Sequence, residues 1–282
     1  MKRGLVLEGG AMRGLFTCGV IDVFLEQGIE FDGGVGISAG AVFGVNYKSR
    51  QIGRPRRYNE TYCRDPRYCS IRSLIKTGDL YGVDFCYRAI PEILDVFDAK
   101  TFSENPMEFY VGATDAETGT IVFHKCTDGG KTDTLWMRAS ASMPIVSRPV
   151  EIEGRYYLDG GIADSIPYAF MESLGYCRNV IVLTQPYGFR KKKQPYAGIY
   201  RTLLKQYPNT ARALIKRPQV YNRQVMDIEQ QERDGTVFVI RPPEPLGIGR
   251  VEKDPKELER VYQIGRREAL ARLDDMKQYL EL

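Results

Sequence analysis

Residues 4–14, GLVLEGGAMRG, and residues 35–47, VGISAGAVFGVNY, decide the fold of this chain of 282 residues. The first stretch opens with an apolar run that predicts a short buried strand, and a helical pattern follows from Arg13. The second predicts a strand at 35–37 and, at 39–47, a helix that is buried on most sides. Strand, helix, strand and helix in succession require parallel pairing with helical crossovers, which predicts an α/β sheet.

The rest of the chain extends this pattern. We predict further strands at 108–113, 120–124, 147–152, 155–158, 179–184 and 236–241. Residues 48–80 are polar and rich in arginine, which predicts a surface excursion, and residues 186–196 resemble a linker loop. A charged helix is expected from Pro255 nearly to the end, with an apolar stripe of Leu258, Val261, Leu270, Leu273 and Leu280. We therefore expect an α/β domain at 1–188 and a C-terminal extension at 189–282, packed on the core and ending in this long helix.

Composition sets the class of protein. Hydrophobic residues make up 43% and charged residues 27% of the chain, which is typical of a soluble globular protein with a large core. No uncharged apolar stretch approaches the roughly 20 residues that a bilayer crossing needs. The apolar run after Met1 is shorter than the roughly 7–15 residues of a secretory signal. We therefore expect a cytoplasmic protein.

The net charge indicates which partners the protein can bind, and the cysteines indicate which metal sites it can form. The net charge of +4 is well short of the excess that a nucleic-acid-binding protein carries. Basic residues gather at 54–57 and 190–193; such clusters are typical of solvated loops and would also suit peripheral contact with the anionic inner membrane surface. Six cysteines without a Cys-x-x-Cys pair, together with a single histidine, indicate reduced thiols and no zinc site.

Gly36-Ile37-Ser38-Ala39-Gly40 matches the Gly-x-Ser-x-Gly nucleophile elbow. A serine at a sharp strand-to-helix turn takes a strained backbone conformation, and its neighbours two residues away must lack side chains so that the chain can pass. The hydroxyl is then held over the sheet at the start of the next helix, where partial positive charge favours an anion. The motif alone is also compatible with a glycine-rich packing turn.

A serine nucleophile needs a base, which is usually a histidine oriented by a carboxylate. The sole histidine, His124, lies in an alternating strand where it can simply face solvent, and its use would give an unusual chain order. We therefore predict that Asp159, which ends a strand and precedes Gly160-Gly161, serves as the base directly. A hairpin turn is the alternative reading, because Asp-Gly is a common turn signal.

The loop Glu8-Gly9-Gly10-Ala11-Met12-Arg13-Gly14 follows the first strand and opens a helix. Its glycines leave backbone N–H groups bare at a helix N-terminus, which is an anion site. A dinucleotide fingerprint fails where Ala11 replaces its middle glycine, and no Gly-Lys-Ser/Thr follows, so a P-loop is excluded. We predict an oxyanion hole formed by Gly9, Gly10 and Ala11 with the help of Arg13.

Together these residues resemble the patatin-like phospholipases, which combine a Gly-Gly-Gly-x-Arg/Lys-Gly loop, a Gly-x-Ser-x-Gly elbow and an Asp-Gly-Gly/Ala motif. Two more stretches are similar to bacterial members of that family: Ala113-Thr114-Asp115 with Thr118-Gly119, and residues 139–144, ASASMP. A turn and a helix end halted by proline are their alternative readings. Ala11 departs from the family glycine, which is acceptable if its backbone φ is negative.

The resemblance covers residues 4–185 and implies a three-layer α/β/α fold with a mainly parallel central sheet. It implies a serine ester hydrolase that cleaves lipid acyl esters through a Ser38–Asp159 dyad and an acyl-enzyme, with no cofactor and no metal. Apolar and aromatic residues between 80 and 110 would line an acyl groove, although ordinary core packing also explains them. Two alternative functions are a nucleotide-binding α/β protein and a lipid-binding protein that kept the scaffold but lost turnover. The extension after residue 189 receives no role.

Overall fold

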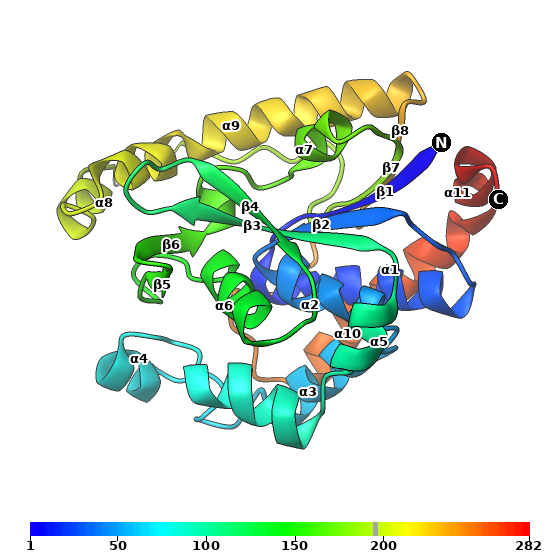
Figure 1. Ribbon diagram of the computed structural model, residues 1–282. Helices are drawn as coiled ribbons and strands as arrows, with labels where there is room; N and C mark the ends of the chain where they lie inside the picture. The colour runs from blue at the N-terminus through cyan, green and yellow to red at the C-terminus, as the bar shows by residue number, and fades with distance from the viewer. Residues whose placement is uncertain (194–196) are drawn as a thin grey trace.

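A computed structural model describes residues 1–193 and 197–282 and places one mixed sheet between two layers of helices (Figure 1). Within these residues the strands follow the order β5-β6-β3-β2-β1-β7-β8, and β4 pairs with β3. Their bounds are β1 Lys2–Leu7, β2 Gly33–Ile37, β3 Glu108–Asp115, β4 Ile121–Cys126, β5 Val150–Ile152, β6 Arg155–Asp159, β7 Tyr176–Val182 and β8 Val237–Ile240. The predicted α/β/α fold is confirmed.

The five neighbours β3, β2, β1, β7 and β8 run parallel, whereas β4 and β6 each pair antiparallel with β3, and β5 pairs antiparallel with β6. Strand β1 explains why the parallel part is buried: Leu5 and Leu7 point into one helical layer and Val6 into the other. Alternate side chains of a strand point to opposite faces, so a strand between two layers needs an unbroken apolar run. This requirement explains why apolar runs in the sequence predict these strands.

Helices α1, α2, α6 and α10 cover one face of the sheet, and α7 and α9 cover the other (Figure 1). The helices are α1 Gly14–Glu26, α2 Ala39–Lys48, α3 Arg54–Tyr62, α4 Ile71–Thr77, α5 Ala99–Glu104, α6 Lys131–Ser140, α7 Tyr168–Ser173, α8 Ala197–Leu203, α9 Pro208–Arg233, α10 Pro255–Ala271 and α11 Leu273–Leu280. Two short 3-10 helices are η1 Ala11–Arg13 and η3 Gly160–Ile162, and one π-helix is η2 Phe85–Leu94. Among the described residues, no helix has both the length and the apolar character that a membrane crossing needs.

The C-terminal region shares the core of the N-terminal region. Strand β8 pairs with β7 in parallel, and Tyr221 and Val225 of α9 belong to the same hydrophobic cluster as Val6 of β1. The domain boundary at residue 188 stays a prediction. Residues 186–193 contain no helix or strand, in line with the linker loop that we predicted, and its last residues, 194–196, lie outside the described part of the chain.

The expected long C-terminal helix is interrupted at Arg272, so it forms two helices, α10 and α11. Its predicted apolar stripe was wrong at Leu270, which is 49% exposed. The buried face of α10 instead continues through Gly265 and Ala269. Leu270 lies about 100° around the helix from Ala269, and this rotation turns it to solvent.

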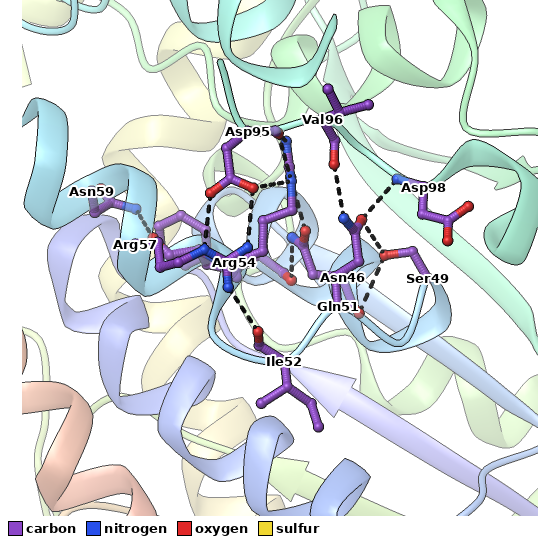
Figure 2. A network of polar contacts seen from close by, with 12 residues as sticks. Asn46, Ser49, Gln51, Ile52, Arg54, Arg57, Asn59, Asp95, Val96 and Asp98 are labelled. Carbon is purple, nitrogen blue, oxygen red and sulfur yellow. Dashed lines mark hydrogen bonds and ion pairs between the residues drawn. The ribbon is translucent and has the colours of Figure 1, made fainter. Parts of the chain in front are cut away.

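The segment 48–80 is more than the surface excursion that we predicted, because α3 packs on α2 through a buried polar network (Figure 2). The Arg54 guanidinium donates to Asn46 Oδ1 at 2.9 Å and to the backbone carbonyl of Asp95. Arg57 binds the Asp95 carboxylate at 3.1 Å, and Gln51 donates to the Val96 carbonyl. The network fastens residues 49–98 to the helix that follows Ser38.

The first basic cluster is paired with acids of the protein, and the second is paired at Arg190. In the first, Arg54 and Arg57 contact Asp95, and Arg56 lies 3.3 Å from Glu259. In the second, Arg190 binds Glu229 at 2.6 Å, whereas residues 192–193 are exposed. Contact with an anionic membrane stays a prediction, and the exposed lysines are the part of these clusters that remains available for it.

Two glycines allow α1 and α10 to approach closely. A Cβ at Gly19 would clash with the carbonyl oxygen of Tyr262, and a Cβ at Gly265 would clash with that of Phe16. At these two positions the contact is therefore backbone against backbone. The contact between α10 and α1 is the main attachment of the C-terminal helices to the helical layer that contains α1.

We predict that Gly265→Ala lowers the free energy of unfolding by roughly 1–3 kcal/mol, because the added methyl group forces the two helices apart. Chemical denaturation measures this change. Gly198→Ala is the matched control, since a Cβ at that helical position meets nothing within 4 Å and should not destabilise the protein. Equal stability of Gly265→Ala and the wild type would contradict the close contact.

Candidate active site

Ser38 occupies the sharp turn between β2 and α2. Its backbone has φ 55° and ψ −121°, a conformation that residues with a side chain rarely adopt. A Cβ at Gly36 would collide with the Gly40 backbone, and one at Gly40 would collide with the carbonyl of Leu7. Both flanking glycines are therefore sterically required, and the turn projects the serine side chain from the C-terminal end of the central parallel strands.

The structure brings Ser38 and Asp159 together across 121 positions of sequence. Ser38 Oγ donates a hydrogen bond to Asp159 Oδ2 at 2.7 Å. Asp159 ends β6, is only 2% exposed, and accepts a hydrogen bond from Gly161 N at Oδ1 over 2.8 Å. One carboxylate oxygen is thus fixed by the backbone while the other faces the serine hydroxyl.

The two stretches 113–119 and 139–144 hold this pair in place. Ser140 Oγ accepts a hydrogen bond from the Ser38 backbone N–H at 2.8 Å and donates to a backbone carbonyl of β3. The Ser142 carbonyl accepts from Asp159 N at 2.9 Å, and Thr114 Oγ1 donates to the Asp159 carbonyl at 2.8 Å. The sequence identifies both stretches by their family-like motifs, but it does not predict this supporting role.

The glycine loop lies against the serine. A Cβ at Gly9 would stand 3.1 Å from Ser38 Cβ, so only glycine permits this approach. Within residues 1–193 and 197–282, the backbone N–H groups of Gly9, Gly10 and Ala11 find no acceptor. The Arg13 N–H is different, because it bonds to the Gly10 carbonyl at 3.2 Å.

Ala11 does not satisfy the condition that we set for it. Its φ is +49°, in the left-handed region, where a Cβ costs about 1–2 kcal/mol. The strain arises because the chain turns directly from Gly10 into the short helix η1. A glycine at this position would be free of that strain.

Two cations that sequence reasoning missed lie close to Asp159. Burial raises the pKa of the Asp159 carboxyl, while the charge of Arg217 and the hydrogen bonds from Ser38 and Gly161 act in the opposite direction, with a smaller contribution from Lys191. Arg217 belongs to α9, and Lys191 lies in the segment after β7. Lys191 belongs to the basic run 190–193, but nothing in the local sequence of either residue predicts a place at this site, because only the folding of α9 across the sheet brings them there.

Glu8 connects the glycine loop to α9. It is buried, its Oε1 accepts a hydrogen bond from the Tyr221 hydroxyl at 2.9 Å, and its Oε2 accepts one from the Thr184 N–H at 2.6 Å. Both carboxylate oxygens are thereby used inside the protein. Glu8 is a support for the site rather than a free acid.

His124 is half-buried instead of facing solvent, which its alternating strand allowed. Its Nε2 lies 2.7 Å from Asp133 Oδ1, and its ring stacks on Trp136 at 5.0 Å. Donor atoms of His124, Cys126 and Asp133 lie within 4.8 Å of one another, a spacing that a metal could use. The second oxygen of Asp133 already accepts three backbone N–H groups, however, so these residues are best explained as a structural cluster.

The residues expected to line an acyl groove divide into two groups. Phe85 and Ile90 are buried in the core, which is the alternative that we had kept, and Ile93 is 73% exposed. Burial raises the pKa of Tyr87, and the charges of Cys86, Asp79 and Asp159 add to that rise. Phe85 also lines a cavity of about 450 Å³ next to η2. The acyl groove stays a prediction.

Two family models match different parts of this chain. A family model described as patatin-like phospholipase matches residues 5–171, and one described as a domain of unknown function (DUF6363) matches residues 207–281. The Escherichia coli K12 protein YjjU is 28% identical over 270 residues, which cover 93% of this chain and 74% of YjjU. Lysophospholipase NTE1 of Coccidioides immitis is 28% identical over 177 residues, which cover 61% of this chain and 11% of the fungal protein.

Among solved structures, VipD from Legionella pneumophila aligns over 98% of this chain and 67% of its own, with 13% identity and a TM-score of 0.48. Because the first family model spans more than half of the sequence and contains the elbow, the glycine loop and Asp159, the chain belongs to the patatin-like phospholipase family.

Proposed function

We propose that the protein is a serine hydrolase that cleaves lipid acyl esters, such as those of phospholipids or lysophospholipids, through an acyl-enzyme on Ser38. The hydrogen bond of 2.7 Å between Ser38 Oγ and Asp159 Oδ2 is the observation on which the proposal rests. Family membership and a relative named lysophospholipase support a lipid ester as the substrate.

In the first step Asp159 Oδ2 accepts the proton of Ser38 as Oγ attacks the ester carbonyl carbon. The negative charge moves to the carbonyl oxygen, where the free N–H groups of Gly10 and Ala11 would stabilise it with the help of Arg13. Loss of one such donor typically costs about 3 kcal/mol in the barrier. The hydrogen bond from Gly161 keeps the carboxylate aligned while its other oxygen receives the proton.

The intermediate then collapses. The bond between the carbonyl carbon and the alcohol oxygen breaks, and the leaving alcohol takes the proton from Asp159. A water molecule next gives a proton to Asp159 and attacks the acyl carbon. The bond between that carbon and Ser38 Oγ then breaks, Asp159 returns the proton to Oγ, and the fatty acid leaves with the Ser38 hydroxyl restored. A single carboxylate serves both half-reactions, so no histidine is needed.

The two alternative functions fit the site less well. A nucleotide-binding protein does not need the strained serine or its contact with Asp159. A lipid-binding protein without turnover would have no use for a buried carboxylate that faces a hydroxyl, because such a group is costly to desolvate. Both alternatives nevertheless make a clear prediction: they tolerate the loss of the Ser38 hydroxyl.

We predict that Ser38→Ala and Asp159→Asn each lower the hydrolysis of p-nitrophenyl acyl esters by roughly a thousandfold or more, because each variant removes one member of the reacting pair. Rates of ester cleavage measure this loss. A fluorophosphonate probe should label the wild type and leave Ser38→Ala unlabelled.

Matched controls are Ser103→Ala and Asp234→Asn, which change exposed residues of the same types and should keep wild-type rates. Thermal unfolding verifies that all four variants are folded. Full activity or labelling of a folded Ser38→Ala variant would exclude the proposed function. A folded wild type that neither cleaves the esters nor takes the label would favour the lipid-binding alternative.

The pH profile provides a second test. Asp159 must be ionised to accept a proton, so kcat/KM should fall as the pH drops through its pKa. Burial raises this pKa above the ordinary aspartate value, and Arg217 opposes that rise. We therefore expect the acidic limb at a higher pH than for an ordinary carboxyl group. In Arg217→Gln the limb should move to still higher pH, and an unchanged limb would show that Arg217 does not act on Asp159.

A further inference from the structure

Three cations gather beside the candidate dyad: Arg13 from the glycine loop, Lys191 from the segment after β7, and Arg217 from α9. Arg217 Nη2 lies 3.2 Å from the point where a Cβ on Gly161 would stand, and Asp159 Oδ1 lies 3.0 Å from the same point. The charge of Arg217 acts on Lys191 and that of Arg13 acts on both, and the exposed Arg250 also acts on Arg217. Arg13, Lys191 and Arg217 are the members that lie inside the protein. The three side chains therefore form one electrostatic cluster.

Helix α9 fixes two members of this cluster. Arg217 and Tyr221 are four residues apart, so they lie on the same face of the helix. The Lys191 ammonium sits over the Tyr221 ring, 3.4 Å from its centroid. The backbone of Lys191 is bound to Asn222 in both directions, at 2.7 and 3.0 Å. The arrangement is held in place by the protein and does not consist of loose surface lysines.

The cations outnumber the acids that could neutralise them. The neighbouring acids are Glu8 and Asp159, whose carboxylate oxygens are already used by Tyr221, Thr184, Ser38 and Gly161. Over residues 1–193 and 197–282, the side chains of Arg13, Lys191 and Arg217 make no ion pair within 4.0 Å. The Nε atoms of both arginines are buried without an acceptor.

Unpaired cations in a half-buried site are unfavourable, and proteins keep them where a ligand supplies the missing charge. Lys191 shows this unfavourable electrostatic environment, because burial and the neighbouring Arg217 lower the pKa of its ammonium group well below its ordinary value. An anion placed between Lys191 and Arg217 would restore that pKa. The guanidinium group has the planar donor geometry that suits a phosphate.

We propose that Lys191 and Arg217 form an anion subsite that binds the phosphate group of the ester substrate and thereby selects phosphate-bearing acyl esters over neutral ones. The inference rests on the proposed function, because it places this phosphate next to the ester cleaved by Ser38. Both residues lie outside the part matched by the patatin-like model, and Arg217 lies in the DUF6363 match. The subsite thus gives the C-terminal region a role in substrate selection.

The test compares two esters with the same short acyl chain: a lysophosphatidylcholine and a monoacylglycerol, both below their micelle concentration. The ratio of their kcat/KM values should favour the phosphate ester in the wild type. It should fall by about 10- to 100-fold in the double variant Lys191→Gln/Arg217→Gln, because charge-assisted hydrogen bonds to the phosphate are lost. Arg217→Lys, which keeps the charge, should retain part of the preference.

Control variants and the direction of the change separate selection from general damage. Lys216→Gln and Arg212→Gln alter exposed cations on the same helix and should leave both rates as in the wild type. A purely structural role of Lys191 and Arg217 would lower both rates together and leave the ratio unchanged. A wild-type ratio near one, or a ratio that the double variant does not change, would overturn the proposal.

A binding experiment distinguishes this proposal from the proposed hydrolase function. If the wild type cleaves neither ester, the hydrolase function fails, and the subsite is judged by binding alone. Inorganic phosphate, compared with chloride at equal ionic strength, should raise the melting temperature of Ser38→Ala and should not do so when Lys191→Gln/Arg217→Gln is added. Stabilisation by free phosphate without a preference for the phosphate ester would overturn substrate selection, and no stabilisation would overturn the anion subsite itself.

Discussion

The hydrogen bond between Ser38 and Asp159 depends on the order in which the strands of the sheet pair. Ser38 depends on two glycines that let the turn pass over β1, and Asp159 depends on β6, which is antiparallel to β3. The two residues meet only because β2 and β6 both pair with β3. Ser140, at the end of α6, then joins the turn to that shared strand. The candidate chemistry is thus a property of strand order, not of any single motif.

The opposite layer of the molecule completes the surroundings of this pair. Helix α9 crosses the sheet and places Tyr221 against Glu8, at the end of β1 (Figure 1). The same face of the helix carries Arg217 toward Asp159. A carboxylate buried among apolar residues would tend to stay protonated. The cations of the C-terminal region counter this tendency, so the two regions of the chain contribute jointly to the electrostatics of the site.

Much of the fold could be predicted from sequence because the buried strands are continuous apolar runs, as at β1, β7 and β8. The meeting of Ser38 and Asp159 could be expected because glycines mark both turns. Helix α9 was missed, since Pro208 and Pro218 interrupt a polar stretch whose apolar positions are widely spaced. The contribution of Arg217 was hidden for a different reason: its distance from Asp159 is set by how α9 crosses the sheet, and no local pattern encodes that crossing.

Strand β8 has a practical consequence for anyone who wishes to shorten this chain. It covers one side of β7, and α9 covers the apolar face beneath it. A fragment that stopped soon after β7 would leave that strand as an open, apolar border of a parallel sheet, ready to join with another copy. The region matched as a domain of unknown function therefore covers a strand edge that would otherwise be open.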